Sequence, residues 1–275
     1  MGTDLEGTTL LKRPGARLYE RAAPPLAELD ALWHLDEGRT FFAGPLDYNA
    51  SHQHGAPVYL AGLYGSFGLR VEGGRWLSVR TAMIPAGVRH ELRLGGQPLG
   101  VFYIEPDLGG ADALVPLVRD TREDNGALVG RTGEVAALRA LYENDGASEW
   151  AGAALGDLLG SSRRQARRAM DPRTARAVAG MSAAPGGLTP VARLAGEVGL
   201  SASRFQHLFT REVGVPFRRY RAWQRMRAAI AEIVRGRTFT AAAHAAGFAD
   251  QAHFGHDFRR TFGAPPSRSL ARIRV

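Results

Sequence analysis

Cysteine is missing from this 275-residue sequence, and so are long apolar runs. Without cysteine there can be no disulfides, thiolate metal sites or cysteine nucleophiles. No apolar run approaches the roughly 18 residues that a membrane-spanning helix needs. The first twenty residues also lack the uninterrupted apolar segment of a secretory signal. We therefore expect a cytoplasmic protein, with which the lack of cysteine agrees.

Lysine is absent from the second part of the chain, where arginine carries all the positive charge. Residues 161–275 contain 21 arginines and 6 acidic residues, a balance of +15, whereas residues 1–160 have a balance of −7. This asymmetry suggests that one part binds a polyanion and the other has a different task. A solvated basic surface explains the charge alone equally well.

The first part of the chain has the pattern of short strands. Residues 40–105 contain β-rich segments such as "VYLAGLYG" and "LGVFYIEP", separated by glycine and proline. They predict a β-barrel or jelly roll, with a tight hairpin at Gly73-Gly74. After residue 110, "ALVPLVRDT", "GEVAALRALYEN" and "SEWAGAALGDLLG" indicate helices. We expect an α+β protein of several domains: a barrel over 1–110, a helical hairpin over 111–160, a linker and first helix over 161–188, and an all-α domain over 189–275.

An internal repeat organises that last domain. Aligning "SASRFQHLFTREVGVP" (201–216) with "DQAHFGHDFRRTFGAP" (250–265) matches two phenylalanines, a histidine, an arginine, a glycine and a proline. Each copy predicts a helix, a glycine turn and a second helix, which is the arrangement of a helix-turn-helix unit. In the second helix of copy two, Phe254, Phe258 and Phe262 form the inward side and leave the other side free.

Residues 171–272 resemble the C-terminal domain of the AraC-type transcription regulators. "AAGFADQAHFGHDFRRTFGAPPS" is similar to that family's signature, and "LAGEVGLSASRFQHLFTREVGVPFRRYRAWQRMRAA" matches its first half. The resemblance implies that the second helix of each unit enters the major groove of double-stranded DNA at a promoter. It also implies a homodimer, formed through the apolar helices of 114–160, and a regulator that acts on RNA polymerase.

Position by position, the resemblance implies two kinds of DNA contact. The base-facing candidates are Ser203, Gln206 and His207 in the first unit and Gln251, Gly255 and His256 in the second, whereas Arg204 is expected either to read a base or to bind phosphate. At two of these positions the chain departs from the family, which usually has arginine at 256 and a small hydroxyl residue at 255. Arg218, Arg219, Arg259 and Arg260 are the phosphate-binding candidates, for which a solvated surface charge is the alternative.

Residues 51–93 resemble the cupin-type effector domain that precedes many AraC-type DNA-binding domains. His52-x-His54 is expected at the start of a strand, and "PAGVRH" ends at His90. Three imidazoles could hold a divalent metal such as zinc, nickel or iron. Cupin enzymes add a glutamate where this chain has Val58, so the alternative is histidines that bond a small-molecule effector, or each other, inside the barrel. Tyr59 and Trp76 are expected to line the same effector pocket.

Three functions remain open for the chain. The leading prediction is a transcription regulator without enzymatic activity that senses a small molecule through its barrel. The second is a cupin metal-dependent enzyme fused to a DNA-binding domain, against which the absent glutamate counts. The third is an architectural protein that binds DNA without sequence preference.

Overall fold

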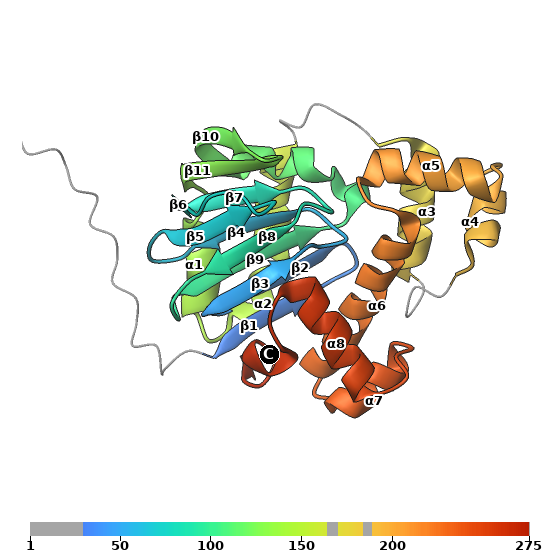
Figure 1. Cartoon of the computed structure of the whole chain (residues 1–275). Coiled ribbons are helices and arrows are strands. Elements are labelled where there is room, and N and C mark those ends of the chain that lie inside the picture. Colours follow the sequence, from blue (N-terminus) through green and yellow to red (C-terminus); the bar gives the residue numbers. More distant parts are fainter. Residues whose placement is uncertain (1–29, 164–169, 184–188, 275) are drawn as a thin grey trace, which may run out of the picture.

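The computed structural model describes residues 30–163, 170–183 and 189–274. Two β-sheets face each other in the N-terminal part and form a barrel-like sandwich, called the barrel below (Figure 1). The eight-stranded sheet has the order β10-β11-β7-β4-β9-β2-β1-β12, and the four-stranded sheet has the order β3-β8-β5-β6. The strands of the barrel are β1 (Ala31–Leu35), β2 (Arg39–Pro45), β3 (Tyr48–His52), β4 (Val58–Gly62), β5 (Phe67–Val71), β6 (Leu77–Val79), β7 (Thr81–Ile84), β8 (His90–Arg93), β9 (Pro98–Ile104), β10 (Val118–Asp124) and β11 (Ala127–Gly133).

Alternating side chains of the large sheet supply two separate hydrophobic cores. On β4, Leu60 belongs to the core between the sheets, whereas Tyr59 belongs to the core on the opposite face. Helices α1 (Ala136–Glu143) and α2 (Ala147–Arg163) cover that opposite face with buried leucines. The helices therefore close the back of the sheet and leave the inner face for the barrel interior.

The predicted boundary at residue 110 is wrong for the sheet, and so is the helix predicted from "ALVPLVRDT". Three short 3-10 turns lie at Pro106–Leu108, Ala111–Ala113 and Val115–Leu117, and the chain then continues into β10. Pro116 within the last turn disfavours a longer helix. Asn125-Gly126, both at positive φ, joins β10 to β11 as a tight hairpin, a signal that the sequence contains.

The C-terminal part is all helical until its last residues, as predicted. It contains α3 (Pro172–Ala183), α4 (Val191–Glu197), α5 (Ala202–Val213), α6 (Phe217–Val234), α7 (Phe239–Ala245), α8 (Gln251–Phe262), a 3-10 turn (Pro266–Arg268) and strand β12 (Ile273–Arg274). Of the linker and first helix predicted over 161–188, residues 164–169 and 184–188 lie outside the described residues, and α3 is the predicted first helix. Strand β12 pairs in parallel with β1, so the end of the chain returns to the barrel. None of the described helices is long and apolar enough to cross a membrane.

The two repeats have the same local structure. Helices α4 and α7 have seven residues each, and α5 and α8 have twelve each. Glycines at positive φ form the turns, with Gly199 at 70° and Gly247 at 77°. This left-handed region disfavours other residues, so glycine permits the sharp change of direction between the helices.

Candidate DNA-binding helices and histidine pocket

Local signals in the sequence define both ends of the candidate recognition helices α5 and α8. The Ser201 side chain accepts a hydrogen bond from the backbone N–H of Arg204, and Asp250 accepts one from His253. These side chains satisfy N–H groups that have no partner within the helix. At the other end, Gly214 and Gly263 adopt the left-handed conformation that terminates each helix.

Each candidate recognition helix buries its phenylalanines and exposes the opposite side. Phe205 and Phe209 of α5 are fully buried, as is Phe254 of α8. Nearly all the predicted base-facing residues lie on the exposed side: Ser203, Arg204, Gln206, His207, Gln251 and His256, with Gly255 half-buried. The Thr240 hydroxyl donates a hydrogen bond of 2.9 Å to Oε1 of Gln251, which holds that side chain while leaving its amide nitrogen free to donate.

The four predicted phosphate-binding arginines are not equivalent. Arg218, Arg259 and Arg260 are exposed. Arg219 is half-buried and donates a hydrogen bond of 2.8 Å from Nη1 to Oε1 of Gln53 in the barrel. Burial, together with Arg260 and Arg89, lowers the pKa of Arg219. In this arrangement Arg219 contacts the barrel, which the sequence did not predict.

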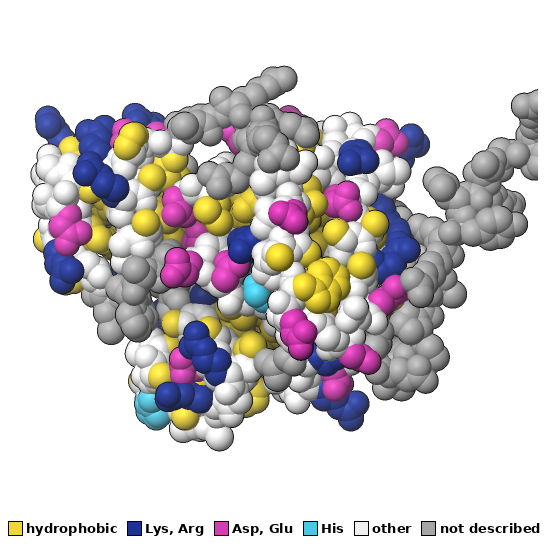
Figure 2. All heavy atoms as spheres, turned by 180° about the vertical axis from the view of Figure 1, so that it is seen from behind, with side chains coloured by type: hydrophobic (Ala, Val, Ile, Leu, Met, Phe, Trp, Pro, Cys, Tyr) yellow, Lys and Arg dark blue, Asp and Glu magenta, His cyan; other side chains and the backbone are white. Residues whose placement is uncertain are grey.

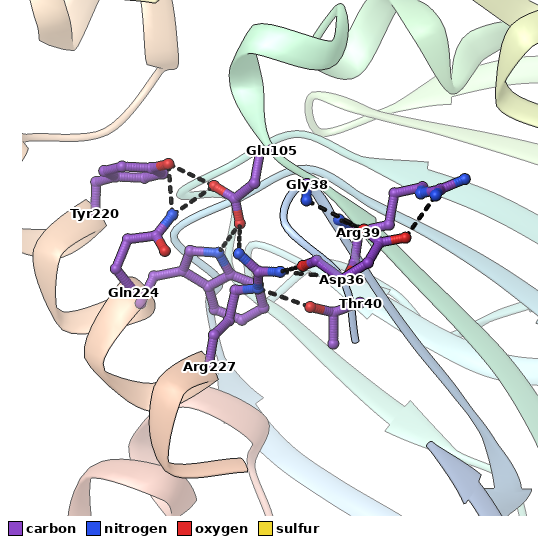
Figure 3. Close-up of polar contacts among 9 residues, drawn as sticks. Asp36, Gly38, Arg39, Thr40, Glu105, Tyr220, Gln224 and Arg227 are labelled. Atoms are coloured by element: carbon purple, nitrogen blue, oxygen red, sulfur yellow. Dashed lines mark hydrogen bonds and ion pairs between the residues drawn. The ribbon is translucent and has the colours of Figure 1, made fainter. Parts of the chain in front are cut away.

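A buried carboxylate joins helix α6 to the barrel (Figure 3). Glu105, which follows β9, is 2% exposed and accepts hydrogen bonds from Tyr220, Trp223 and Gln224. Nη1 of Arg227 lies 3.0 Å from the same carboxylate. Arg227 also donates to the Thr40 hydroxyl at 2.8 Å, and to backbone carbonyls of β2 and its preceding turn. Helix α6 buries an apolar stripe that includes Trp223, Met226 and Ile230. The polar contact with Glu105 was not predicted from the sequence.

The three predicted histidines meet inside the barrel, at the end that faces the helical domain. His52 lies at the end of β3 and not at the start of a strand as predicted, and His90 begins β8. One nitrogen from each of His52, His54 and His90 lies within 4.8 Å of the others, and all three side chains are buried. His54 also lies 3.3 Å from the Tyr103 hydroxyl. We call these three residues the histidine triad.

Two residues that the sequence placed beside the triad lie elsewhere. Tyr59 faces the opposite side of the sheet, where its hydroxyl donates to the backbone carbonyls of Leu117 and Glu134. Trp76 is half-exposed, and the guanidinium groups of Arg70 and Arg93 lie 5.0 and 4.4 Å from the centre of its ring. The cavity at the triad is lined by Trp33, Phe42, Leu46, Asn49, His52, His54, Leu60, Leu92, Val101, Tyr103, Phe258, Phe262 and Ser269. Alternation along a strand separates neighbouring side chains such as Tyr59 and Leu60 onto opposite faces.

Burial keeps the triad neutral near pH 7. It lowers the pKa of His52 to about 4, and it lowers the pKa values of His54 and His90 well below their usual range. The low-dielectric interior disfavours a charged imidazole. A neutral imidazole is also the form that coordinates a metal.

The imidazole nitrogens of the triad are suitable ligands for a divalent metal. The Nδ1 atoms of His52 and His90 face the backbone carbonyls of Ala50 and Val88, at 2.7 and 3.1 Å. Such bonds fix the tautomer and direct Nε2 toward a ligand. Nε2 of His90 is buried and has no hydrogen-bond partner among the described residues. Tetrahedral zinc would draw the three nitrogens to about 3.4 Å from one another, since its Zn–N bonds measure roughly 2.0–2.1 Å.

Comparison with known proteins agrees with this architecture. Residues 194–272 match a family described as a helix-turn-helix domain. An apo variant of ToxT from Vibrio cholerae has a similar fold, with a TM-score of 0.57 and 13% identity, over 85% of this chain and 97% of that one. Wild-type ToxT bound to an unsaturated fatty acid has a TM-score of 0.56 and 13% identity, over 87% of this chain and 97% of that one. No curated protein matches the chain in sequence.

The matched residues begin within α4 and end after the 3-10 turn that follows α8, so they contain nearly all of both helix-turn-helix units. The likeness to ToxT extends over the barrel as well, and at 13% identity it concerns the fold. The chain therefore carries an AraC-type helix-turn-helix domain over residues 194–272, and its overall two-domain fold is that of ToxT.

Proposed function

We propose that the protein is a sequence-specific transcription regulator that binds promoter DNA through α5 and α8 and senses a small molecule through its barrel. One observation carries the proposal: α5 and α8 each bury a side that contains phenylalanines and expose a polar side. A helix of this kind can enter the major groove with its polar side toward the base edges. The domain's excess of arginine supplies attraction to phosphate.

The experiment that tests DNA recognition is footprinting of the full chain on the DNA that flanks its own gene. A regulator protects a defined site at a salt concentration where random DNA has dissociated. An architectural binder would show little preference among sequences once salt is raised. Protection without sequence preference would therefore contradict the proposal.

Two substitutions separate base reading from phosphate binding. We expect Gln206→Ala to change which base pairs are preferred at one position, because glutamine can pair with adenine through two hydrogen bonds. We expect Arg218→Ala to weaken all DNA alike and to reduce the salt slope of log K by about 1. Binding assays on a panel of single-base variants at several salt concentrations measure both effects. Arg131→Ala, which removes an exposed arginine from the barrel, is the control and should change neither.

For the sensing role, the barrel contributes an internal cavity that contains both apolar and polar side chains. ToxT has been crystallised with an unsaturated fatty acid and with a naphthalenyl butenoic acid, which indicates that its fold admits organic ligands. This supports an effector site in the present chain without identifying its ligand.

A metal at the histidine triad is a separate part of the proposal. His52, His54 and His90 would hold a divalent ion such as zinc, which could fix the barrel or bind an effector. The same triad favours the second candidate function, a cupin-type enzyme, in which the ion would act as a Lewis acid. Metal analysis of the full chain and of a His52→Ala/His90→Ala variant distinguishes these roles. Loss of metal with an altered footprint supports sensing, whereas loss of metal with an unchanged footprint supports separate chemistry.

Dimerisation is proposed through α2 on the back of the molecule. Trp150, Ala154 and Leu158 are spaced four residues apart and are only partly buried. Figure 2 shows that face, where apolar side chains lie among acidic ones. We expect Leu158→Glu to lower the mass measured by light scattering to that of a monomer. Ala153→Glu, on the exposed neighbouring side of the helix, should leave the mass unchanged.

A further inference from the structure

The end of helix α8 lines the cavity inside the barrel. Phe258 and Phe262 line the same cavity as His52 and His54, although more than 200 residues separate them in sequence. The ring of Phe262 lies 5.7 Å from that of His54 and 6.3 Å from that of Tyr103. Figure 1 shows the C-terminal end of α8 directed at the barrel beside β3. The helical domain thus supplies one wall of the cavity.

Backbone contacts hold the end of α8 in this position. The Asn49 side chain donates a hydrogen bond of 2.6 Å to the carbonyl of Phe262, and the Ala50 amide donates one of 2.9 Å to Gly263. Gly263 is pressed against β3 so closely that a Cβ atom there would overlap the Ala50 carbonyl and lie 2.7 Å from Nδ1 of His52. The contact therefore depends on the absence of a side chain at this position.

The space that remains is too small for an organic effector. The cavity has a volume of about 40 Å³. This is room for about one or two water molecules, whereas sites for organic ligands measure roughly 300–1,000 Å³. A molecule of phenyl size that enters the barrel must therefore displace a side chain that lines the cavity, and Phe262, at the end of α8, is one of these.

We propose that the barrel is a binding site for a small aromatic molecule that replaces the phenyl ring of Phe262. The rings of His54, Tyr103, Trp223 and Phe258 already surround a phenyl group there. Asn49 and the imidazoles of His52 and His54 offer hydrogen bonds to one polar substituent on the ring. The ligand class is accordingly a ring of phenyl size with a hydroxyl or similar group.

Binding of this ligand and docking of α8 exclude each other. A molecule in the place of Phe262 breaks the contacts of Asn49 and Ala50 with the end of α8, so the second candidate recognition helix moves relative to the barrel. By linkage, the ligand weakens the packing of α8 on the barrel by the same free energy by which packed α8 weakens ligand binding. The use of this competition to sense a ligand rests on the regulator function proposed above. The competition between the ligand and α8 for the same space does not depend on that function.

Phenol binding to the full chain tests the exclusion. We expect phenol to bind Phe262→Ala at least tenfold more tightly than the wild type, because the substitution removes the competing ring. Calorimetry measures the affinities, and circular dichroism checks that the variant is folded. Phe239→Ala, which removes a phenyl group that stacks on Phe254 at 6.3 Å, is the control and should bind phenol like the wild type. Equal phenol affinity in Phe262→Ala and the wild type would overturn the proposal.

Hydrogen exchange of the Ala50 amide is the second measurement, and it needs no variant. Saturating phenol should raise the exchange rate of this amide in the wild type, because its acceptor is the carbonyl of Gly263. Phenol that binds and leaves the Ala50 amide protected would contradict the exclusion. Neither measurement involves DNA, so a negative footprint with positive phenol results would remove the proposed function and leave the aromatic site standing.

A pair of glycine variants covers the case in which Phe262→Ala does not fold. Gly263→Ala and Gly214→Ala both place a Cβ at a left-handed helix end, but at Gly214 the closest barrel atom, the Ala86 carbonyl oxygen, is at an ordinary 3.6 Å. We expect only Gly263→Ala to raise phenol affinity and Ala50 exchange. Equal behaviour of the two variants would count against the proposal.

Discussion

At the scale of single residues, Glu105 joins the barrel to the helical domain. Its carboxylate is surrounded by four side chains of α6, and one of them, Arg227, is itself 7% exposed. An isolated charge in such a place is unfavourable, so each ion depends on the other. The pair also makes the packing of α6 on the barrel specific, because few other placements of this helix on the barrel would give both charged groups a partner.

Replacing Glu105 should therefore destabilise the protein strongly. We expect Glu105→Gln to lower the free energy of unfolding by about 3–5 kcal/mol, since it leaves the Arg227 guanidinium buried without a counter-charge. Urea denaturation measures the change. The double variant Glu105→Gln/Arg227→Met should lose less than the sum of the two single variants. Strict additivity would show that the two groups do not interact.

At the scale of elements, the helix-turn-helix units were predictable and the β10–β11 hairpin was not recognised. Helices α5 and α8 follow from a period of about four residues in their phenylalanines, a capping side chain and a terminal glycine, all of which are local. The burial pattern of β10 contains a single buried residue at its start. Such a strand at the edge of a sheet lacks the alternation that identifies strands in a sequence.

The cap of α8 gives a prediction at this scale. We expect Asp250→Ala to lower the free energy of unfolding by about 1 kcal/mol, because the His253 amide loses its acceptor. Urea denaturation measures the change, and the same substitution at the corresponding cap of α5, Ser201→Ala, provides the comparison. The hydrogen bond at Ser201 is longer, 3.3 Å against 2.7 Å, so the effect there should be smaller. A larger loss at Ser201 would contradict this account of the caps.

At the scale of the whole molecule, the two halves share one hydrophobic core. Residues of the barrel interior such as Leu60 belong to the same buried cluster as Phe205 and Ile230 of the helical domain. Strand β12 adds a backbone connection, and Arg274 forms an ion pair with Asp145 next to α2. The domains predicted as separate units are thus continuous in their packing.

We expect the full chain to unfold in a single transition because of this shared core. Tryptophan fluorescence, which reports on Trp33, Trp76 and Trp150 in the N-terminal part and on Trp223 in α6, should change at the same urea concentration as the far-ultraviolet circular dichroism. Coincident transitions are the mark of two-state unfolding. Two separated transitions would show that the barrel and the helices are stable independently.

Local patterns in the sequence determined the repeated helix-turn-helix units, their exposed polar sides and most strands of the barrel. They did so because capping, periodicity and glycine turns act within a few residues. The three histidines were also identified from the sequence, although Tyr59 and Trp76 were wrongly grouped with them. Only the tertiary structure decided that Phe262 lines the cavity at the triad and that Glu105 meets Arg227. These contacts join residues more than 100 positions apart, and they depend on how two domains pack, which no local pattern encodes.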